Sequence, residues 1–92
     1  MRYTVAWRDT ALQQLARIWM RAADKDAVNR AAARIDRELV IDPETKGWDY
    51  YGDRVLPVSP LWALYTIRPD DRQVEALQVG QPGIDLPHTD TP

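Results

Sequence analysis

The stretch Asp53–Val79, DRVLPVSPLWALYTIRPDDRQVEALQV, decides the fold of this chain. Its middle part, Leu61–Arg68, is almost entirely apolar or aromatic and is rich in residues that favour an extended backbone. Such a run between two prolines predicts a strand that is buried on both faces. Pro69–Arg72 has turn chemistry, because proline presets the turn dihedral and aspartate side chains bond neighbouring amides. We therefore predict an antiparallel meander of three strands at residues 54–59, 61–68 and 74–79. The first of these strands contains Pro57, which cannot donate a hydrogen bond, so we expect it at an edge or a bulge.

The residues before this sheet predict a short strand and a first helix. Tyr3, Val5 and Trp7 alternate along residues 3–7 and therefore share one face of a strand. Thr10 and Gln13 have the spacing of a capping box, which predicts that a helix starts at Thr10. Its apolar side chains recur at spacings of three and four, and Trp19 is the largest of them. We expect this face to pack on the sheet, with Trp19 as its main anchor. The apolar set is Leu12, Leu15, Ile18, Trp19 and Ala22.

A second helix is predicted from Ala27 to Leu39. Residues 24–26 contain two aspartates that can cap its start, and Asp42-Pro43 ends it, because proline disfavours helix for the preceding residue. One face of this helix holds Arg30, Arg34 and Arg37, with carboxylates four residues away from the first two. We favour a solvated face of paired charges over a binding stripe.

The predicted fold class is α+β: a short N-terminal strand, an antiparallel two-helix hairpin, then the three-stranded meander, with the helices on one face of the sheet. The 92 residues correspond to one domain, which we expect to span residues 1–80. Residues 81–92 are rich in proline and glycine, and we expect them to form a flexible tail. Residues 44–52 are predicted to form a loop that carries Trp48, Tyr50 and Tyr51. These aromatics either plug the edge of the core or form a recognition surface, and we favour the plug.

Composition excludes several classes of function. A net charge of −2 argues against nonspecific nucleic-acid binding over the whole surface. There is no cysteine and one histidine, so thiolate zinc sites and multi-histidine metal sites are excluded, and we expect no metal and no cofactor. The sequence lacks the apolar region of a signal peptide and any stretch long enough to span a membrane. We therefore expect a cytoplasmic protein without a membrane partner.

The ordered series of motifs resembles the RelE/ParE family of bacterial type II toxins, also called plasmid-stabilisation toxins. The resemblance extends over about residues 1–80, and each motif is weak when taken alone. It rests on the following segments: Tyr3–Trp7, Ala11-Leu12 with Leu15, Ala32–Leu39, which contains ARIDREL, Asp42-Pro43, Arg54-Val-Leu, Leu64–Ile67 and Val74–Val79.

The resemblance implies a compact toxin that is held by a segment of a cognate antitoxin lying across its surface. Family members differ in target: some cut messenger RNA on the ribosome, and ParE-like members inhibit DNA gyrase. The chain departs from the messenger-cleaving pattern, because Trp62 or Ala63 holds the place of an arginine before the central Leu-Tyr pair. Basic residues are also missing after the last strand, where the chain has Gln81-Pro82-Gly83, and the Pro-rich tail replaces a C-terminal helix with a functional tyrosine.

Candidate site residues follow from this combination. Arg54 occupies a position that the wider family usually keeps basic, and with Arg68 it is the candidate for charge stabilisation in an endoribonuclease. Arginine, tryptophan and tyrosine suit a binding site, because they pair bidentately with anions and carry interface energy. The candidates for binding a target or an antitoxin are Arg17, Arg21, Trp48, Tyr50, Tyr51 and Trp62. We expect an antitoxin to use the sheet edge near Pro57 and the groove beside the first helix.

The chemical case for an enzyme is thin. His88 is the one group that titrates near neutral pH, and we interpret it as incidental because it lies in the tail. Asp70-Asp71 follows a proline, a pattern typical of a turn. Three hypotheses remain: a toxin that acts by binding its target, a ribosome-dependent endonuclease that uses Arg54 and Arg68, and an inactive relative that serves as an interaction module.

Overall fold

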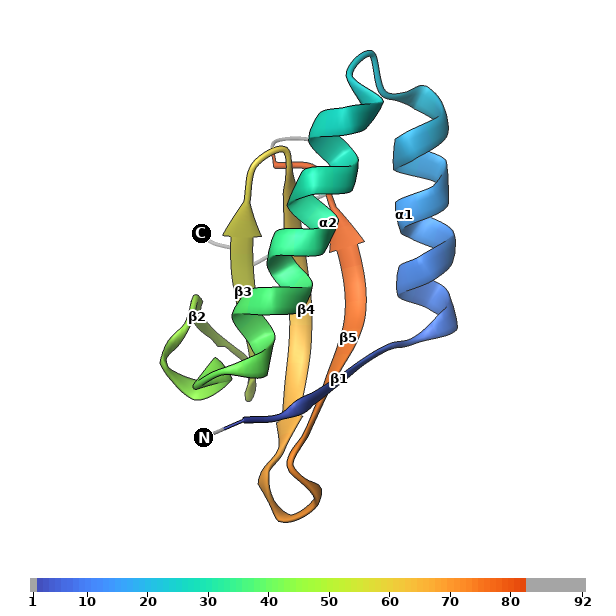
Figure 1. The fold of residues 1–92 in the computed structure, drawn as a ribbon. Coiled ribbons are helices and arrows are strands. Elements are labelled where there is room, and N and C mark those ends of the chain that lie inside the picture. The colour runs from blue at the N-terminus through green and yellow to red at the C-terminus, as the bar shows by residue number, and fades with distance from the viewer. Residues whose placement is uncertain (1, 83–92) are drawn as a thin grey trace.

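Two helices cover one face of a five-stranded sheet in the computed structural model, which describes residues 2–82 (Figure 1). This arrangement confirms the predicted α+β class and the placement of both helices on one side. No helix within residues 2–82 is both long and apolar enough to cross a membrane. The elements are β1 (Thr4–Trp7), α1 (Asp9–Arg21), α2 (Lys25–Val40), β2 (Trp48–Tyr50), β3 (Asp53–Val58), β4 (Leu61–Arg68) and β5 (Gln73–Gly80), with 3-10 turns at Pro43–Thr45 and Pro69–Asp71.

The strands lie in the order β1-β5-β4-β3-β2. The β3-β4-β5 meander is antiparallel, as predicted, and β1 lies parallel to β5. The expectation of an unbroken loop at residues 44–52 is wrong, because Trp48–Tyr50 forms β2 and pairs with β3 as far as Val55. Pro57 lies beyond that pairing, so it occupies an open edge of the sheet, where a missing amide donor is tolerated.

Strand β4 is the centre of the core, and its residues 61–65 are all buried. Because side chains alternate across a strand, Leu61, Ala63 and Tyr65 point into the core beneath the helices. Trp62 and Leu64 point to the other face, where they form a second cluster with Val55 of β3. The prediction of a strand buried on both faces is therefore confirmed.

Helix α1 differs from its prediction at two points. It begins at Asp9, and Arg8 occupies the N-cap without a side-chain hydrogen bond, so the capping box at Thr10 does not form. Trp19 is 40% exposed and is not the anchor that we expected. The buried side of α1 is centred on Ala11 and Ile18, and a helix places Trp19 about 100° around the axis from Ile18. Trp19 instead lies on the outer surface, with the Lys25 ammonium 5.0 Å from its ring centroid.

Helix α2 begins and ends close to the prediction. The Asp24 side chain caps it by accepting a hydrogen bond from the Ala27 amide at 3.0 Å. The helix ends at Val40, and Asp42 then adopts a left-handed conformation with φ 49° before Pro43. Its buried face, led by Ile35 and Leu39, completes the core over the sheet.

Candidate functional site

A hollow of about 450 Å³ lies between α1 and the ends of β4 and β5. It brings together three of the predicted binding residues, Arg17 and Arg21 of α1 and Trp62 of β4. Three glutamines, at positions 14, 78 and 81, contribute to the same lining. These residues are far apart in the sequence, and the packing of α1 beside β5 makes them neighbours.

The edge of β5 fixes the position of α1. Strand β1 pairs with β5 only as far as Ala76, which leaves the later part of that edge without a strand partner. The Gln14 side chain fills this place by accepting a hydrogen bond from the Val79 amide at 2.9 Å. Arg17 and Arg21 follow Gln14 on α1 and are one turn apart, so both guanidinium groups reach the same side of the helix.

The lining of this hollow is rich in hydrogen-bond donors. The two arginines are exposed and form no ion pair with another residue of the described part of the chain. Trp62 is 2% exposed, and its indole N–H finds no acceptor within residues 2–82. Within residues 2–82, no carboxylate and no histidine line this hollow. This hollow is therefore suited to binding an anionic group rather than to transferring protons.

The three aromatic candidates lie elsewhere, on and beside β2. Trp48 is 45% and Tyr51 79% exposed, so neither plugs the core, and the favoured interpretation is wrong for both. Tyr50 is half-buried against the Val55 cluster and does serve as a plug. Tyr51 and Gly52 form a two-residue hairpin turn in which both have positive φ, and this turn directs the Tyr51 ring outward beside Tyr50.

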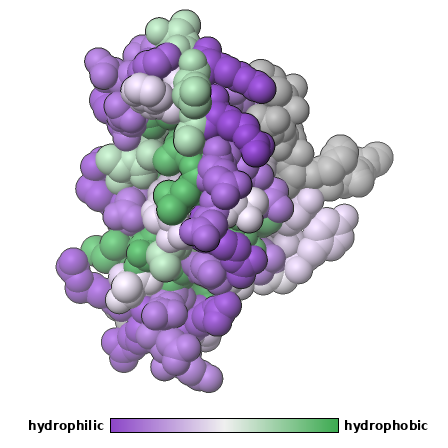
Figure 2. All heavy atoms as spheres, turned by 90° about the vertical axis from the view of Figure 1, so that its right-hand side faces the viewer, coloured by the Kyte–Doolittle hydropathy of each residue, from purple (hydrophilic) through white to green (hydrophobic). Residues whose placement is uncertain are grey.

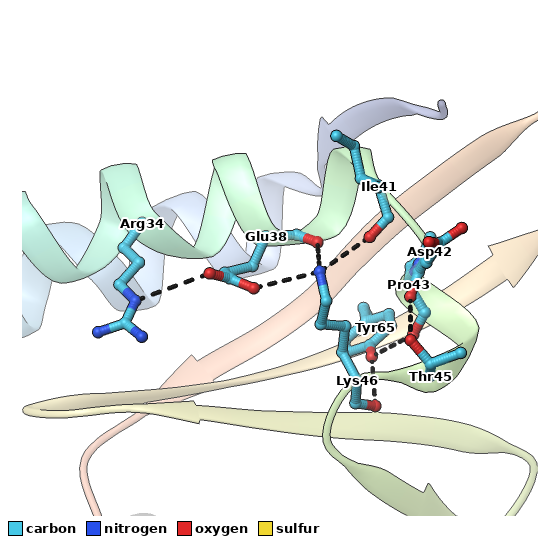
Figure 3. Close-up of polar contacts among 8 residues, drawn as sticks. All are labelled: Arg34, Glu38, Ile41, Asp42, Pro43, Thr45, Lys46 and Tyr65. Carbon is cyan, nitrogen blue, oxygen red and sulfur yellow. Dashed lines mark hydrogen bonds and ion pairs between the residues drawn. The ribbon is translucent and has the colours of Figure 1, made fainter. Parts of the chain in front are cut away.

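Arg54 binds the backbone of its own fold. Its Nε donates to the Lys46 carbonyl at 2.8 Å, and its Nη2 donates to the Gly47 carbonyl at 3.2 Å. The Tyr65 hydroxyl lies opposite Arg54 in the ladder and donates to the same Lys46 carbonyl and to that of Pro43. Figure 3 shows the Tyr65 contacts, and Lys46 in turn reaches Glu38 and the carbonyl oxygens at the end of α2. Arg54 is thus engaged in holding the segment between α2 and β2.

Arg68 lies on the other face of the sheet. Cross-strand partners share a face and neighbours alternate, so Arg54 and Tyr65 point toward the helices and Arg68 points away. Arg68 forms an ion pair with Glu75 at 3.0 Å, and Arg8 pairs with the same carboxylate at 3.1 Å. The hydrogen bond from Arg8 holds the pKa of Glu75 below its usual value. The structure does not bring Arg54 and Arg68 together. His88 and most of the predicted tail lie outside the described residues.

The arrangement of helices and strands is shared with known toxin structures. The chain matches one from the RelBE2 toxin–antitoxin complex of Mycobacterium tuberculosis with a TM-score of 0.70 and 19% identity, over 88% of this chain and 92% of that one. It matches one from the chromosomal ParDE system of P. aeruginosa with a TM-score of 0.63 and 14% identity, over 87% and 96%. It matches a mutant of E. coli toxin RelE in the free state with a TM-score of 0.64 and 15% identity, over 90% of this chain and 86% of that one. The chain has the RelE/ParE toxin fold.

This likeness is one of structure, because the matched sequences are only 14–19% identical to this one. No protein-family model matches the sequence, and no curated protein matches it. The predicted resemblance to RelE/ParE toxins is nevertheless confirmed at the level of the fold, by neighbours that cover about nine-tenths of the chain.

A second hollow of about 430 Å³ lies on the helical side of this RelE/ParE fold. Its lining is apolar and includes Leu12, Trp19 and Met20, which are 48%, 40% and 72% exposed. Figure 2 views the α1 side of the molecule and shows hydrophobic surface between hydrophilic flanks. The sequence prediction assigned Leu12 and Trp19 to the core and therefore missed this surface as a whole, although it did expect a groove beside the first helix.

Tyr65→Phe tests the polar cluster around Arg54. The change removes the hydroxyl group that bonds the Pro43 and Lys46 carbonyls, and we expect it to lower the free energy of unfolding by about 1–3 kcal/mol.

Burial raises the pKa of the Tyr65 hydroxyl above 10.0, while the neighbouring Arg54 acts in the opposite direction. Because its pKa is higher in the folded state, the hydroxyl group contributes its full stabilisation at pH values below its pKa in the unfolded state. This contribution is lost as the pH rises through its pKa in the folded state. Urea melts from neutral to alkaline pH should therefore show the wild type approaching the Phe variant above about pH 10. A constant difference across this range would contradict this account.

Proposed function

We propose that this protein is the toxin of a bacterial type II toxin–antitoxin pair. It arrests growth by binding a cellular target and is neutralised by a cognate antitoxin. The observation that carries the proposal is the RelE/ParE toxin fold over about nine-tenths of the chain, shared with structures of toxins and toxin–antitoxin complexes. The targets in question, the translating ribosome with its messenger RNA and DNA gyrase, are cytoplasmic, and we propose the same location for this protein.

The hollow lined by Arg17, Arg21 and Trp62 is the proposed contact with the target. These two guanidinium groups lie one turn apart, form no ion pair within residues 2–82, and can form bidentate hydrogen bonds with a carboxylate or a phosphate. Trp62 also lines this hollow, with its own N–H buried. An anionic group of the target would therefore satisfy donors that the rest of this described region leaves without an acceptor.

Binding is favoured over messenger cleavage by the places of Arg54 and Arg68. A cleavage site needs several groups around one phosphate. These two arginines lie on opposite faces of the sheet, one held by backbone carbonyls and the other by Glu75. They cannot act on the same phosphodiester without a rearrangement of both.

The apolar hollow of Leu12, Trp19 and Met20 is the proposed docking site for the antitoxin. Exposed apolar side chains gathered beside one helix suit an amphipathic partner helix. This site is separate from the hollow that contains Trp62, so neutralisation and target binding use different residues.

Induced expression in a bacterial host, with and without the small protein encoded beside this gene, tests the proposal. We expect growth arrest when the chain is expressed alone and recovery when the neighbour is present. Leu12→Ser/Met20→Ser should still arrest growth but should no longer be relieved by the neighbour, because both side chains are largely exposed and their loss weakens docking more than folding. Translation and DNA supercoiling, measured in arrested cells, identify the target class. Normal growth of cells that contain abundant folded protein would contradict the toxin proposal.

A further inference from the structure

Helix α2 borders a third hollow, of about 530 Å³, on the side away from α1. It lies between α2 and the end of β3, and its charged lining consists of Arg30, Arg34 and Arg37. At a helical rise of 1.5 Å per residue, these arginines are spaced along the axis by roughly 6 Å and roughly 4.5 Å. They form a continuous stripe that neither the fold nor the proposed target site uses.

The stripe is short of compensating charge. Arg34 reaches Glu38 at a distance of 3.9 Å, which is the limit of an ion pair between two solvated side chains. Arg30 and Arg37 form no ion pair with any residue in the range 2–82, although Asp26 is four residues before Arg30. No carboxylate lines the hollow within that same range. The prediction of a solvated face with paired charges therefore holds for Arg34 alone.

Apart from the arginines and Ser59, the hollow is lined by small apolar side chains, which we call its floor. Ala27, Ala31 and Ala33 of α2 and Val58 of β3 provide it, and alanines allow a second helix to approach closely. The adjacent edge of β3 is open beyond Val55, but Pro57 lies on it and has no amide to donate to an added strand. This edge therefore disfavours an extended occupant, and the floor favours a helical one.

We infer that this hollow binds an acidic amphipathic helix of a partner protein, with carboxylates repeated every three or four residues and small apolar residues between them. Carboxylates on this spacing match the three guanidinium groups, and the small apolar residues match the alanine floor. Single-stranded nucleic acid fits less well. The lining contributed by residues 2–82 holds no aromatic ring on which a base could stack, and the chain carries a net charge of −2. The site is distinct from both hollows assigned above and does not depend on the proposed function.

Fluorescence anisotropy with defined probes tests the inference on the full chain. The probe is a labelled helical peptide of about 16 residues, with glutamates every three or four residues on an alanine-rich background. The first comparison is the same peptide with glutamine in place of glutamate, and the second is a single-stranded RNA of equal charge. We expect the acidic peptide to bind, the glutamine peptide to bind at least about tenfold more weakly, and binding to weaken with added salt.

The variant Arg30→Gln/Arg34→Gln/Arg37→Gln should weaken binding of the acidic peptide about tenfold or more. Its matched control is Arg2→Gln/Arg8→Gln/Arg72→Gln, which removes the same charge from exposed positions outside all three hollows and should change binding by much less. Circular dichroism establishes that both variants are folded. The inference is overturned if the peptide does not bind the wild type, if both triple variants weaken it equally, or if the glutamine peptide binds as well. Tighter binding of the RNA, lost in the α2 variant, would instead assign the stripe to nucleic acid.

Discussion

Ile35→Ala should lower the free energy of unfolding by about 2–5 kcal/mol, which is a large share of the stability of a small domain. Trp19→Ala should lower it by only about 1–2 kcal/mol, although tryptophan is the larger residue. Ile35 is fully buried between α2 and the sheet, and its removal leaves a cavity. Trp19 is 40% exposed, and water can fill the space that it leaves.

Urea unfolding followed by far-ultraviolet circular dichroism measures both changes without relying on tryptophan fluorescence. Met20→Ala is a useful control, because Met20 is 72% exposed and lies next to Trp19 on α1. Its effect should be smaller than that of Trp19→Ala. A loss for Trp19→Ala that equals or exceeds the loss for Ile35→Ala would mean that α1 is rotated about its axis relative to the arrangement described above.

Gly47→Ala should destabilise the fold by about 3 kcal/mol or more, since a strained backbone and a steric overlap both contribute. Gly47 has φ +63°, a conformation that residues with a Cβ rarely adopt. A Cβ at this position would also lie 1.9 Å from the Val55 carbonyl oxygen, and neither backbone can move without disturbing β3. The segment between α2 and β2, which Arg54 and Tyr65 hold in place, would have to be displaced.

Gly52→Ala provides the matched control. Gly52 also has a positive φ, of +90°, but apart from Gly52 and its two chain neighbours no described residue has an atom within 4 Å of the place that an alanine methyl group would occupy there. Only the conformational cost remains, so we expect a loss of about 1–2 kcal/mol. Equal losses in thermal or urea melts of the two variants would show that the contact with Val55 contributes nothing.

The strands of the meander could be predicted because their local signals agree with one another. Leu61–Arg68 combines β-favouring residues with proline at both ends, and β4 occupies that same range. Strand β2 could not be predicted in this way. It has three residues, and its Tyr51-Gly52 turn lacks the asparagine or aspartate that usually marks a two-residue hairpin. Its pairing depends on β3, and the sequence alone does not reveal such a nonlocal partner.

The orientation of α1 was predicted less well than its existence. Its apolar residues span too wide an arc for all of them to face the core, and the sequence does not show which half is covered. Contact with β5, fixed by Gln14, buries Ala11 and Ile18 and leaves Leu12 and Trp19 outside. The same contact places two arginines of α1 beside the Trp62 indole, a proximity that the spacing along the chain does not indicate.

The candidate catalytic pair illustrates the limit of reasoning by residue type. Arg54 and Arg68 are both cations on neighbouring strands, and nothing in their chemistry separates them. The alternation of side chains along the strands puts them on opposite faces of the sheet. Arg54 there donates to backbone carbonyls, and Arg68 pairs with the Glu75 carboxylate. An arginine that stabilises a loop and one that binds a target look alike in sequence.

Counting colony-forming cells after induced expression of Arg17→Gln/Arg21→Gln is the most direct test of the proposed target site. Each lost charged hydrogen bond costs about 1.5–3 kcal/mol, so affinity for the target should fall about 100-fold or more. Both side chains are exposed, so the variant should remain folded and should still bind the neighbouring antitoxin. We predict that wild-type expression arrests growth and that the double variant, present at equal level, leaves colony numbers at their uninduced value. Arrest as deep in the double variant as in the wild type would contradict the assignment of toxicity to this hollow.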